Sequence, residues 1–483
     1  MAPIYSALYE YIKINQLFLY LIAFLCVLML IRTCRISLPF SAKSLMWFAI
    51  ILGLVLRIAW LGFSSHEPKM KWDGAIQLEN DWINIHAVDL TKGIWFHEEN
   101  GEPSGRRPIG YPIFLGALYQ IFGYHPMAAW SAHLALFVVT AWLLFRITSL
   151  LFSERAAVWA SFFVSIYPTS IYSVKLITDE HLFLPLWYGG LCLLLYEVRY
   201  GFRKTSWVWY GLIFGLATIT RTNTIFMPVV VGLALVLRKA GWRRAVLHTI
   251  LVALVMQAVN LPWVIRNYRV WGVPVLYTAT APALYTQVNE TATVENGGHI
   301  PERGETGFSE EWERAKASKN QGRMHQVANQ EMKRWIMAHP TDFLVNGAVR
   351  IFSLMQWNRK GGVWPIWYQY WEGSYAPQRP LLGRTRFLVE EAAFAAYYIL
   401  FHCFLFSLIM LFGQWRTLDH ALRVGLIVLA ACFIFWLLEH MVIFPHRKYR
   451  YPLEPLMMVV AVYFLDYAMS VFSWTRLEWM KKK

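Results

Sequence analysis

The chain has 483 residues and a formal net charge of +15, with 57% hydrophobic and 16% charged side chains. A soluble protein carries about a quarter charged residues, so the composition excludes an ordinary soluble domain and indicates an integral membrane protein. Much of the positive charge sits in short loops between apolar segments, where the positive-inside bias places it. The charge therefore does not indicate a nucleic-acid partner.

Apolar segments of roughly 20 residues are the signature of helices that cross a bilayer. About eleven such segments occur along the chain, which predicts an all-α polytopic bundle of about 10–13 spans. The shorter apolar stretch Tyr111–Phe122 is expected to lie in the membrane interface. The predicted spans are Gln16–Ile31, Ser44–Phe63, Trp130–Thr148, Ala156–Ile171, Leu182–Val198, Trp207–Thr220, Asn223–Leu237, Val246–Trp263, Ala392–Phe412, Val424–Val442 and Leu456–Ser473.

Lys and Arg in the short loops set the expected orientation. The cations of alternate loops fall on one side of the predicted bundle, which we interpret as cytoplasmic. The N-terminus is then outside, the C-terminus is inside, and the first apolar segment, which lacks a small-residue cleavage site, is a span. These cations include Arg146 and Arg155, Arg199 to Lys204, Arg238 to Arg244, Arg416 and Arg423, and Lys481 to Lys483.

Two long segments fall on the opposite, extracytoplasmic side. We expect four regions: an extra N-terminal span (1–43), a transmembrane core (44–263) that contains the first outer loop (64–129), a large outer loop (264–391), and C-terminal spans with a basic tail (392–483). The stretch Glu310–Met337 is amphipathic and is expected to form a helix that covers the site or lies on the membrane.

Three groups of polar residues are candidates for chemistry. Glu79 and Asp81 lie in the first outer loop, where a carboxylate can accept a proton from an attacking hydroxyl. Glu180 and His181 lie at a tight turn between two spans, where solvation of the turn is the plain alternative. Neither His spacing nor Cys spacing predicts a metal site or a disulfide, so no cofactor is expected; a divalent metal has no support in the sequence.

The third group is cationic and lies on the extracytoplasmic side, against the positive-inside bias. Ionisable groups at membrane depth are costly and usually functional, although long side chains also reach the interface by snorkelling. A phosphate ligand at the outer surface explains the exception. The predicted phosphate-binding residues are Arg57, Arg107, Arg221, Arg266, Lys448 and Arg450.

Six short motifs stand in a fixed order along the chain. The order resembles the GT-C class of integral-membrane glycosyltransferases, and is most similar to the branch of the protein O-mannosyltransferases and the transferase that adds aminoarabinose to lipid A. Ile109 stands where that branch has a second Pro. The motifs are A-V-D-L-T-K-G (87–93), R-P-I-G-Y-P (107–112), D-E-H-L-F (179–183), T-R-T (220–222), P-W-V-I-R-N-Y (262–268) and K-Y-R-Y-P-L-E-P (448–455).

The resemblance implies an enzyme that takes a sugar from a polyprenyl-phosphate carrier on the outer face of the membrane. It also implies a first-loop carboxylate as base, usually with inversion at the anomeric carbon. By spacing, that acid is Glu79; because the family usually has Asp there, followed by a Tyr that this chain lacks, Asp81 remains an alternative. Tyr111, Tyr268 and Tyr285 are candidates for stacking on sugar faces, and Glu180 and His181 for binding the substrate.

The sequence thus predicts a glycosyltransferase of a cytoplasmic (inner) membrane that acts outside the cytoplasm. Its expected partners are a polyprenyl-phosphate sugar donor, a glycan, lipid or protein acceptor, and membrane lipids. A flippase or transporter of a lipid-linked sugar is one alternative, although inverted repeats typical of transporters are not evident. An O-antigen ligase or polymerase is another, and a structural scaffold is a third, although a scaffold does not need arginines facing outward.

Overall fold

The computed structural model describes residues 41–65, 81–98, 101–292, 299–355, 380–443 and 445–481. Over these ranges the regular structure is helical. The β-structure among the described residues is an isolated bridge between His97 and Pro103. The predicted all-α class is confirmed. The predicted span Gln16–Ile31 lies outside the described residues.

The chain is a multi-pass membrane protein. Within the described ranges, six helices are long and apolar enough to cross a bilayer, and the bent pair α6–α7 makes a seventh. Helices α9 (Ser206–Thr220) and α10 (Met227–Leu237) are apolar but shorter, so the count of about eleven spans stays a prediction. The long helices are α2 (Ala42–Ser65), α5 (Pro126–Leu151), α8 (Glu180–Tyr200), α11 (Trp242–Trp271), α17 (Pro380–Gly413) and α18 (His420–Glu439), followed by α19 (Glu454–Lys481).

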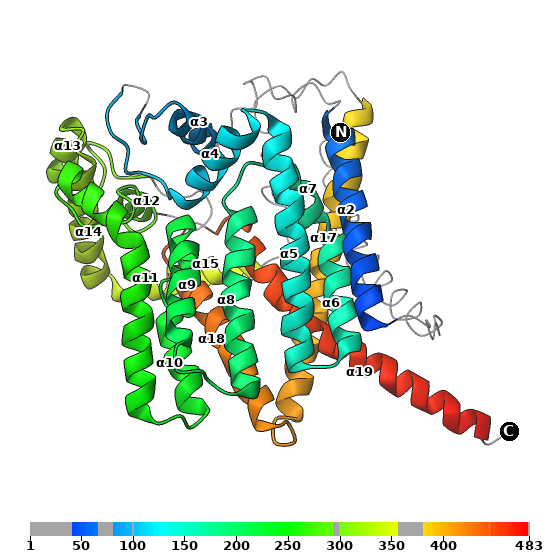
Figure 1. Cartoon of the computed structure of the whole chain (residues 1–483). Coiled ribbons are helices and arrows are strands. Elements are labelled where there is room, and N and C mark those ends of the chain that lie inside the picture. The colour runs from blue at the N-terminus through cyan, green and yellow to red at the C-terminus, as the bar shows by residue number, and fades with distance from the viewer. Residues whose placement is uncertain are drawn as a thin grey trace, which may run out of the picture.

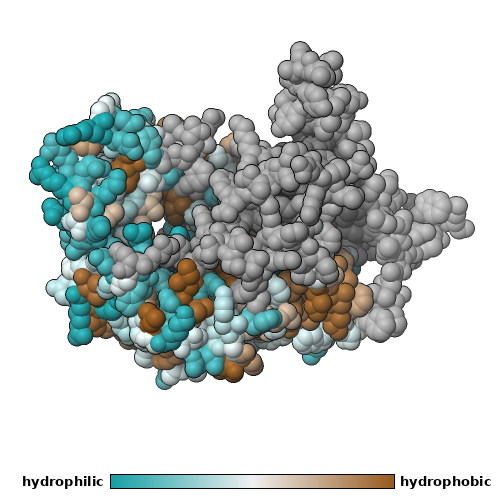
Figure 2. All heavy atoms as spheres, turned by 90° about the horizontal axis from the view of Figure 1, so that it is seen from above, coloured by the Kyte–Doolittle hydropathy of each residue, from teal (hydrophilic) through white to brown (hydrophobic). Residues whose placement is uncertain are grey.

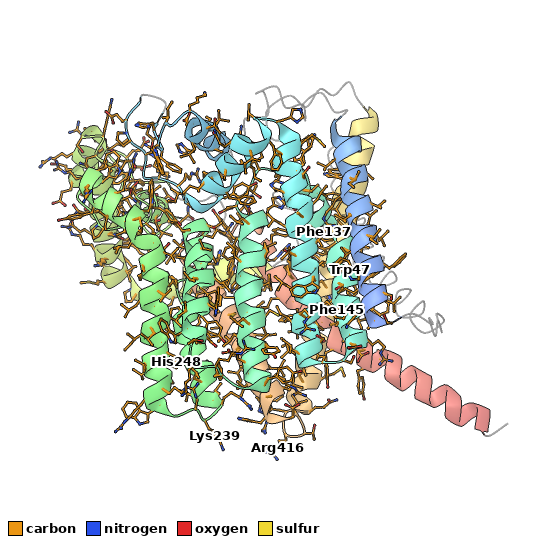
Figure 3. The ribbon with its side chains drawn as sticks, viewed as in Figure 1. Trp47, Phe137, Phe145, Lys239, His248 and Arg416 are labelled. Atoms are coloured by element: carbon orange, nitrogen blue, oxygen red, sulfur yellow. The ribbon has the colours of Figure 1, made fainter. Side chains whose placement is uncertain are left out.

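The two ends of the bundle differ in character. The short loops that join α8 to α9, α10 to α11 and α17 to α18 lie together at the lower end in Figure 1. Lys239 and Arg416 mark this end in Figure 3. Of the two long segments between spans, the described helices α3, α4, α12 and α13 lie toward the opposite end (Figure 1). The basic loops Arg199 to Lys204 and Arg238 to Arg244 and the loop with Arg416 thus lie at one end, as predicted, whereas the predicted cations Arg32 and Arg35 lie outside the described residues.

The predicted span Ala156–Ile171 is not a single helix. It is α6 (Glu154–Ile166) and α7 (Pro168–Tyr172), bent by 51° together with the short η2 (Ser173–Lys175). Pro168 begins α7, and because proline has no N–H and blocks the preceding turn, the helix cannot run through it. The bend frees carbonyl groups at the end of α6 in an apolar surrounding, where each needs a donor.

Arg57 of α2 supplies those donors. Its side chain is 1% exposed and its guanidinium carbon lies 3.4 Å from the centre of the Phe137 ring. The guanidinium thus closes the bend between α6 and α7 against α2. Its hydrogen-bond acceptors are the carbonyl oxygens of Gly53 (2.9 Å), Ser165 (3.0 Å) and Val164 (3.2 Å) and the hydroxyl of Ser170 (2.6 Å).

The outer layer consists of short helices. The first outer segment contributes α3 (Asp81–Thr91) and α4 (Gly110–Phe122), which agrees with the helix predicted at Tyr111–Phe122. The second contributes α12 (Thr280–Tyr285), α13 (Glu310–Ala317), α14 (Gln321–Ala338) and α15 (Pro340–Met355). Seen from above, the surface over α13 and α14 is largely hydrophilic (Figure 2).

The single helix expected over Glu310–Met337 is divided in two. The break falls at Ser318–Asn320, where Lys319 has a φ of 55°. The Asn320 side chain then accepts a hydrogen bond from the Arg323 backbone nitrogen (2.9 Å) and begins α14. Asn is among the best residues for this position because its short side chain reaches the free N–H groups of the first turn.

Candidate active site

A cluster of four charged side chains lies where α8, α9 and the K-Y-R-Y-P-L-E-P motif meet. Arg221, directly after α9, lies 3.3 Å from Asp179 and contacts Glu180, the first residue of α8. The pKa of Lys448, in η4 (Arg447–Tyr449), is raised because the acids Glu180 and Asp179 outweigh its burial. Two carboxylates and Arg221 are thus held together at the ends of α8 and α9, with Lys448 near them.

The cluster is desolvated. The side chains of Arg221, Asp179 and Glu180 are 7%, 15% and 0% exposed. Charges removed from water interact more strongly than surface charges, and breaking such a pair is far more costly than breaking an exposed one. The predicted Glu180, Arg221 and Lys448 are brought together here, although three separate motifs carry them.

An acid that the motifs did not indicate completes the arrangement. Asn223 accepts a hydrogen bond from Arg221 Nε (3.2 Å) and donates one to Glu439 Oε2 (2.7 Å) at the end of α18. Glu439 lies inside the predicted span Val424–Val442. An acid in an apolar span is costly, so the rule that singled out Arg57 also applied to Glu439. Asn223 and Glu439 fix the orientation of the Arg221 guanidinium.

His181 contacts a different part of the chain. Its ring stacks on His133 of α5 at 3.8 Å, and its Nε2 donates to the Ser173 carbonyl (2.9 Å). The Tyr111 hydroxyl contacts His133 Nε2, and His133 Nδ1 donates to the Val174 carbonyl (2.7 Å). Tyr111 is fully buried. These three rings hold η2 against α4 and α5, so they support the turn that carries Asp179 and Glu180.

Arg266 joins the two outer segments. Its Nη1 donates to the Ser104 carbonyl (2.8 Å) and to the Asn267 side chain (2.9 Å), and its guanidinium lies 4.6 Å from the Trp263 ring centre. The Asn267 amide in turn donates to the Leu276 carbonyl (3.1 Å). The P-W-V-I-R-N-Y motif thus fastens the loop before R-P-I-G-Y-P to the segment after α11.

Arg450 is committed to a separate buried pair. Its Nε donates to Glu454 (2.8 Å), and its guanidinium carbon lies 3.4 Å from the Tyr397 ring centre. The Arg450 and Glu454 side chains are 7% and 2% exposed. The pair fixes the start of α19 against α17. A phosphate at Arg450 must displace Glu454.

The other predicted residues lie further out. Arg107 and Tyr268 are exposed, with Tyr268 at 59%, whereas Tyr285 is 2% exposed and packs against Trp312 in the outer layer. Asp81 begins α3; Glu79 lies outside the described residues. The stacking roles of the three tyrosines and the choice between the two acids therefore stay predictions. Among the described side chains, no three His, Cys, Asp or Glu residues are grouped to hold a metal.

R-P-I-G-Y-P packs through a glycine against Thr220, the residue before Arg221. A Cβ on Gly110 falls 2.5 Å from Thr220 Oγ1 and 2.8 Å from the Thr220 backbone nitrogen. Real Cβ atoms do not approach backbone this closely, so α4 can begin against the end of α9 only with glycine here. Thr220 directly precedes Arg221, so the motif determines how closely the outer loop covers the charges.

Asp179 gives the site an expected pH dependence. Burial, together with the adjacent Glu180, raises the pKa of Asp179 to about 6, while Arg221 and Lys448 oppose the shift. Below that pH, Asp179 loses its charge and its attraction for Arg221. Transfer is therefore expected to fall about tenfold between pH 7 and pH 5, measured as initial rates in nanodiscs.

Stability has the opposite expected sign. A carboxyl whose pKa is raised by folding favours the fold at low pH and loses this contribution as pH rises through about 6. Acid loss of transfer through Asp179 is therefore not accompanied by unfolding from this group. Asp179→Asn should flatten the acid limb, and an unchanged limb in that variant would assign the titration to another residue.

The comparisons with known proteins agree with the sequence motifs. The model of the family described as dolichyl-phosphate-mannose-protein mannosyltransferase matches residues 106–263, roughly a third of the chain. No curated protein matches. A solved structure, the archaeal oligosaccharyltransferase AglB from Archaeoglobus fulgidus in complex with an inhibitory peptide and a dolichol-phosphate, has 12% identity and a TM-score of 0.49, over 88% of this chain and 50% of that one.

This chain therefore spans about half the length of that archaeal enzyme. The matched segment 106–263 begins one residue before R-P-I-G-Y-P, includes Asp179, Glu180 and Arg221, and ends at Trp263. The family match confirms the predicted resemblance to the GT-C class of membrane glycosyltransferases, since residues 106–263 are similar to the dolichyl-phosphate-mannose-protein mannosyltransferases.

Proposed function

We propose that this protein moves a sugar from a polyprenyl-phosphate carrier to a hydroxyl of a lipid-linked or surface glycan, or of a protein, on the extracytoplasmic face of the cytoplasmic membrane. The observation that carries the proposal is the desolvated cluster of Asp179, Glu180 and Arg221, with Lys448 near enough for the two acids to raise its pKa. It lies within and beside the segment matched by the mannosyltransferase family, at the end of the bundle opposite the basic loops.

The chemistry asks for few groups. A first-loop carboxylate, Glu79 or Asp81, takes the proton of the acceptor hydroxyl as the acceptor oxygen attacks the anomeric carbon. The bond from that carbon to the phosphate oxygen breaks, and the carrier phosphate leaves with the electron pair. Attack from the opposite face inverts the anomeric carbon. The leaving phosphate gains one negative charge, which a preorganised cation stabilises most strongly in a site shielded from water.

Arg221 and Lys448 are the cations we assign to the leaving phosphate. Asp179 and Glu180 hold them in place before the donor binds, which reduces the reorganisation needed during transfer. Asn223, fixed by Glu439, orients the Arg221 guanidinium. Arg57, Arg266 and Arg450 are occupied by carbonyl groups or by a carboxylate, so in this proposal they support the site without binding the phosphate.

The test is transfer by the purified full chain in nanodiscs, with dolichyl- and undecaprenyl-phosphate sugars as donors. Glu79→Gln and Asp81→Asn are compared: the variant that lacks the base is expected to lose at least about a hundredfold in rate, while the other retains most activity. If both retain full activity, the first-loop base is wrong. If no donor is consumed but the labelled carrier changes leaflet, the flippase alternative replaces the transferase.

A further inference from the structure

A cavity lies in the outer layer, separate from the charged cluster. Its volume is about 310 Å³, which is at the lower end of the range for small-molecule sites. It lies between the first outer segment, which contributes Arg106, and the helices α12 and α14 of the second. Its wall is mostly apolar and includes Ala279, Pro282, Ala283, Ile300, Trp312 and Met324.

The polar side of this cavity is already satisfied by the protein. Gln321 Oε1 accepts hydrogen bonds from the Gly105 backbone nitrogen (3.0 Å) and the Thr278 hydroxyl (2.7 Å). Gln321 Nε2 donates to Glu98 (2.9 Å). These bonds tie both outer segments together. They also leave this amide little capacity for the hydroxyls of a sugar, so the cavity suits an apolar group.

The rim of the cavity is cationic. Arg106 lines the cavity and its side chain is 54% exposed, although it lies 3.3 Å from Glu98. More than half of the Arg106 side chain stays exposed beside Glu98, so its guanidinium can meet a second carboxylate. An apolar group that arrives with a neighbouring negative charge is complementary to both the wall and the rim.

The chain segment that lines the cavity also contacts α9, the helix that ends beside the charged cluster. Thr278 lines the cavity, while the hydroxyl of the preceding residue, Tyr277, donates to the Thr218 carbonyl (2.9 Å) near the end of α9. A group bound in the cavity is therefore held next to the segment that positions Arg221. The surface over α13 and α14 is hydrophilic (Figure 2), which favours entry from water rather than from the bilayer.

The geometry points to a binding site for one large apolar side chain of a polypeptide acceptor, with an acidic residue beside it that faces Arg106. That the bound polypeptide is the sugar acceptor rests on the function proposed above. The binding site itself does not. The acceptor segment lies across the outer layer, anchored by this side chain, with its reactive hydroxyl reaching toward the cluster. The site selects acceptors by their neighbouring sequence.

Binding can be measured without turnover. Two acidic, Ser-containing peptides that differ only in a central Phe or Ala are titrated against the full chain in nanodiscs. Burial of a phenyl ring predicts at least about tenfold tighter binding of the Phe peptide. Ala283→Phe fills the cavity and should abolish the difference. Ala317→Phe, at an exposed position that ends α13, is the matched control and should preserve it.

Arg106→Gln should weaken both peptides and reduce the salt dependence of binding. If Ala283→Phe does not fold, Met324→Trp fills the same space from α14. Equal binding of the two peptides, or a Phe preference that survives filling, overturns the proposal. Displacement of the Phe peptide by submicellar decanoate, lost in Ala283→Phe, assigns the cavity to a lipid chain instead. Peptide binding without sugar transfer leaves this site intact and overturns the proposed function alone.

Discussion

Replacement of Arg221 by Ala is expected to lower transfer at least about a hundredfold and to destabilise the fold by about 3–5 kcal/mol. The guanidinium contacts Asp179, Glu180 and Asn223, all at the junction of three spans. Removing it leaves two neighbouring carboxylates with Lys448 as their remaining cation in the cluster. Initial rates and thermal unfolding in detergent measure the two effects separately.

A double substitution separates catalysis from folding. In Arg221→Ala with Glu180→Gln, one carboxylate charge is removed together with the cation, so much of the lost stability should return. Transfer should not return, because the phosphate still lacks its cation. Arg221→Lys keeps the charge but not the planar fork, and an intermediate rate is expected. Recovery of transfer in the double variant would show that Arg221 only neutralises Glu180.

Replacement of Gly110 by Ala is expected to have a comparable effect on transfer from a single added methyl group. The new Cβ meets the Thr220 backbone at 2.8 Å, and because backbone cannot move as a side chain does, α4 must separate from the end of α9. Such overpacking costs about 1–3 kcal/mol. Arg221 follows Thr220, so the displacement reaches the cluster directly. The loss in rate, expressed as an activation free energy, should therefore exceed the loss in free energy of unfolding.

Gly189→Ala is the matched control. Gly189 lies inside α8, and a Cβ there has an ordinary contact of 3.9 Å with Leu143. Alanine is a better helix former than glycine, so this variant should be neutral or slightly more stable. If Gly110→Ala transfers sugar as well as Gly189→Ala does, the close approach of α4 to α9 has no role in the reaction.

The sequence predicted the helices, but it did not indicate which groups of the protein the cations contact. Arg57 and Arg266 were expected to bind phosphate because cations near spans are costly. The structure shows that carbonyl oxygens can meet the same cost: those of the α6–α7 bend for Arg57, and that of Ser104 for Arg266. Free carbonyls arise from breaks in the backbone, and hydropathy does not show where breaks fall.

Glu439 shows the reverse failure. The acid lies within a predicted apolar span, and the argument from cost applied to it equally. It belongs to none of the six motifs, so the family resemblance does not indicate it. Only its hydrogen bond with Asn223, 216 positions away in the chain, shows that it supports Arg221. Contacts between distant spans depend on packing that periodicity alone does not determine.

Arg57 also constrains how the protein is assembled in the bilayer. Arg57 lies near one end of the apolar span Ala42–Gly62, and a guanidinium in a lone transmembrane helix costs up to about 2.5–3.5 kcal/mol on insertion scales. The bent α6–α7 pair has a matching deficit, since its carbonyl groups lack donors when α2 is absent. Each segment inserts into the bilayer poorly alone and favourably beside the other. We therefore expect α2 to stay at the insertion machinery until α6 has been synthesised, about a hundred residues later.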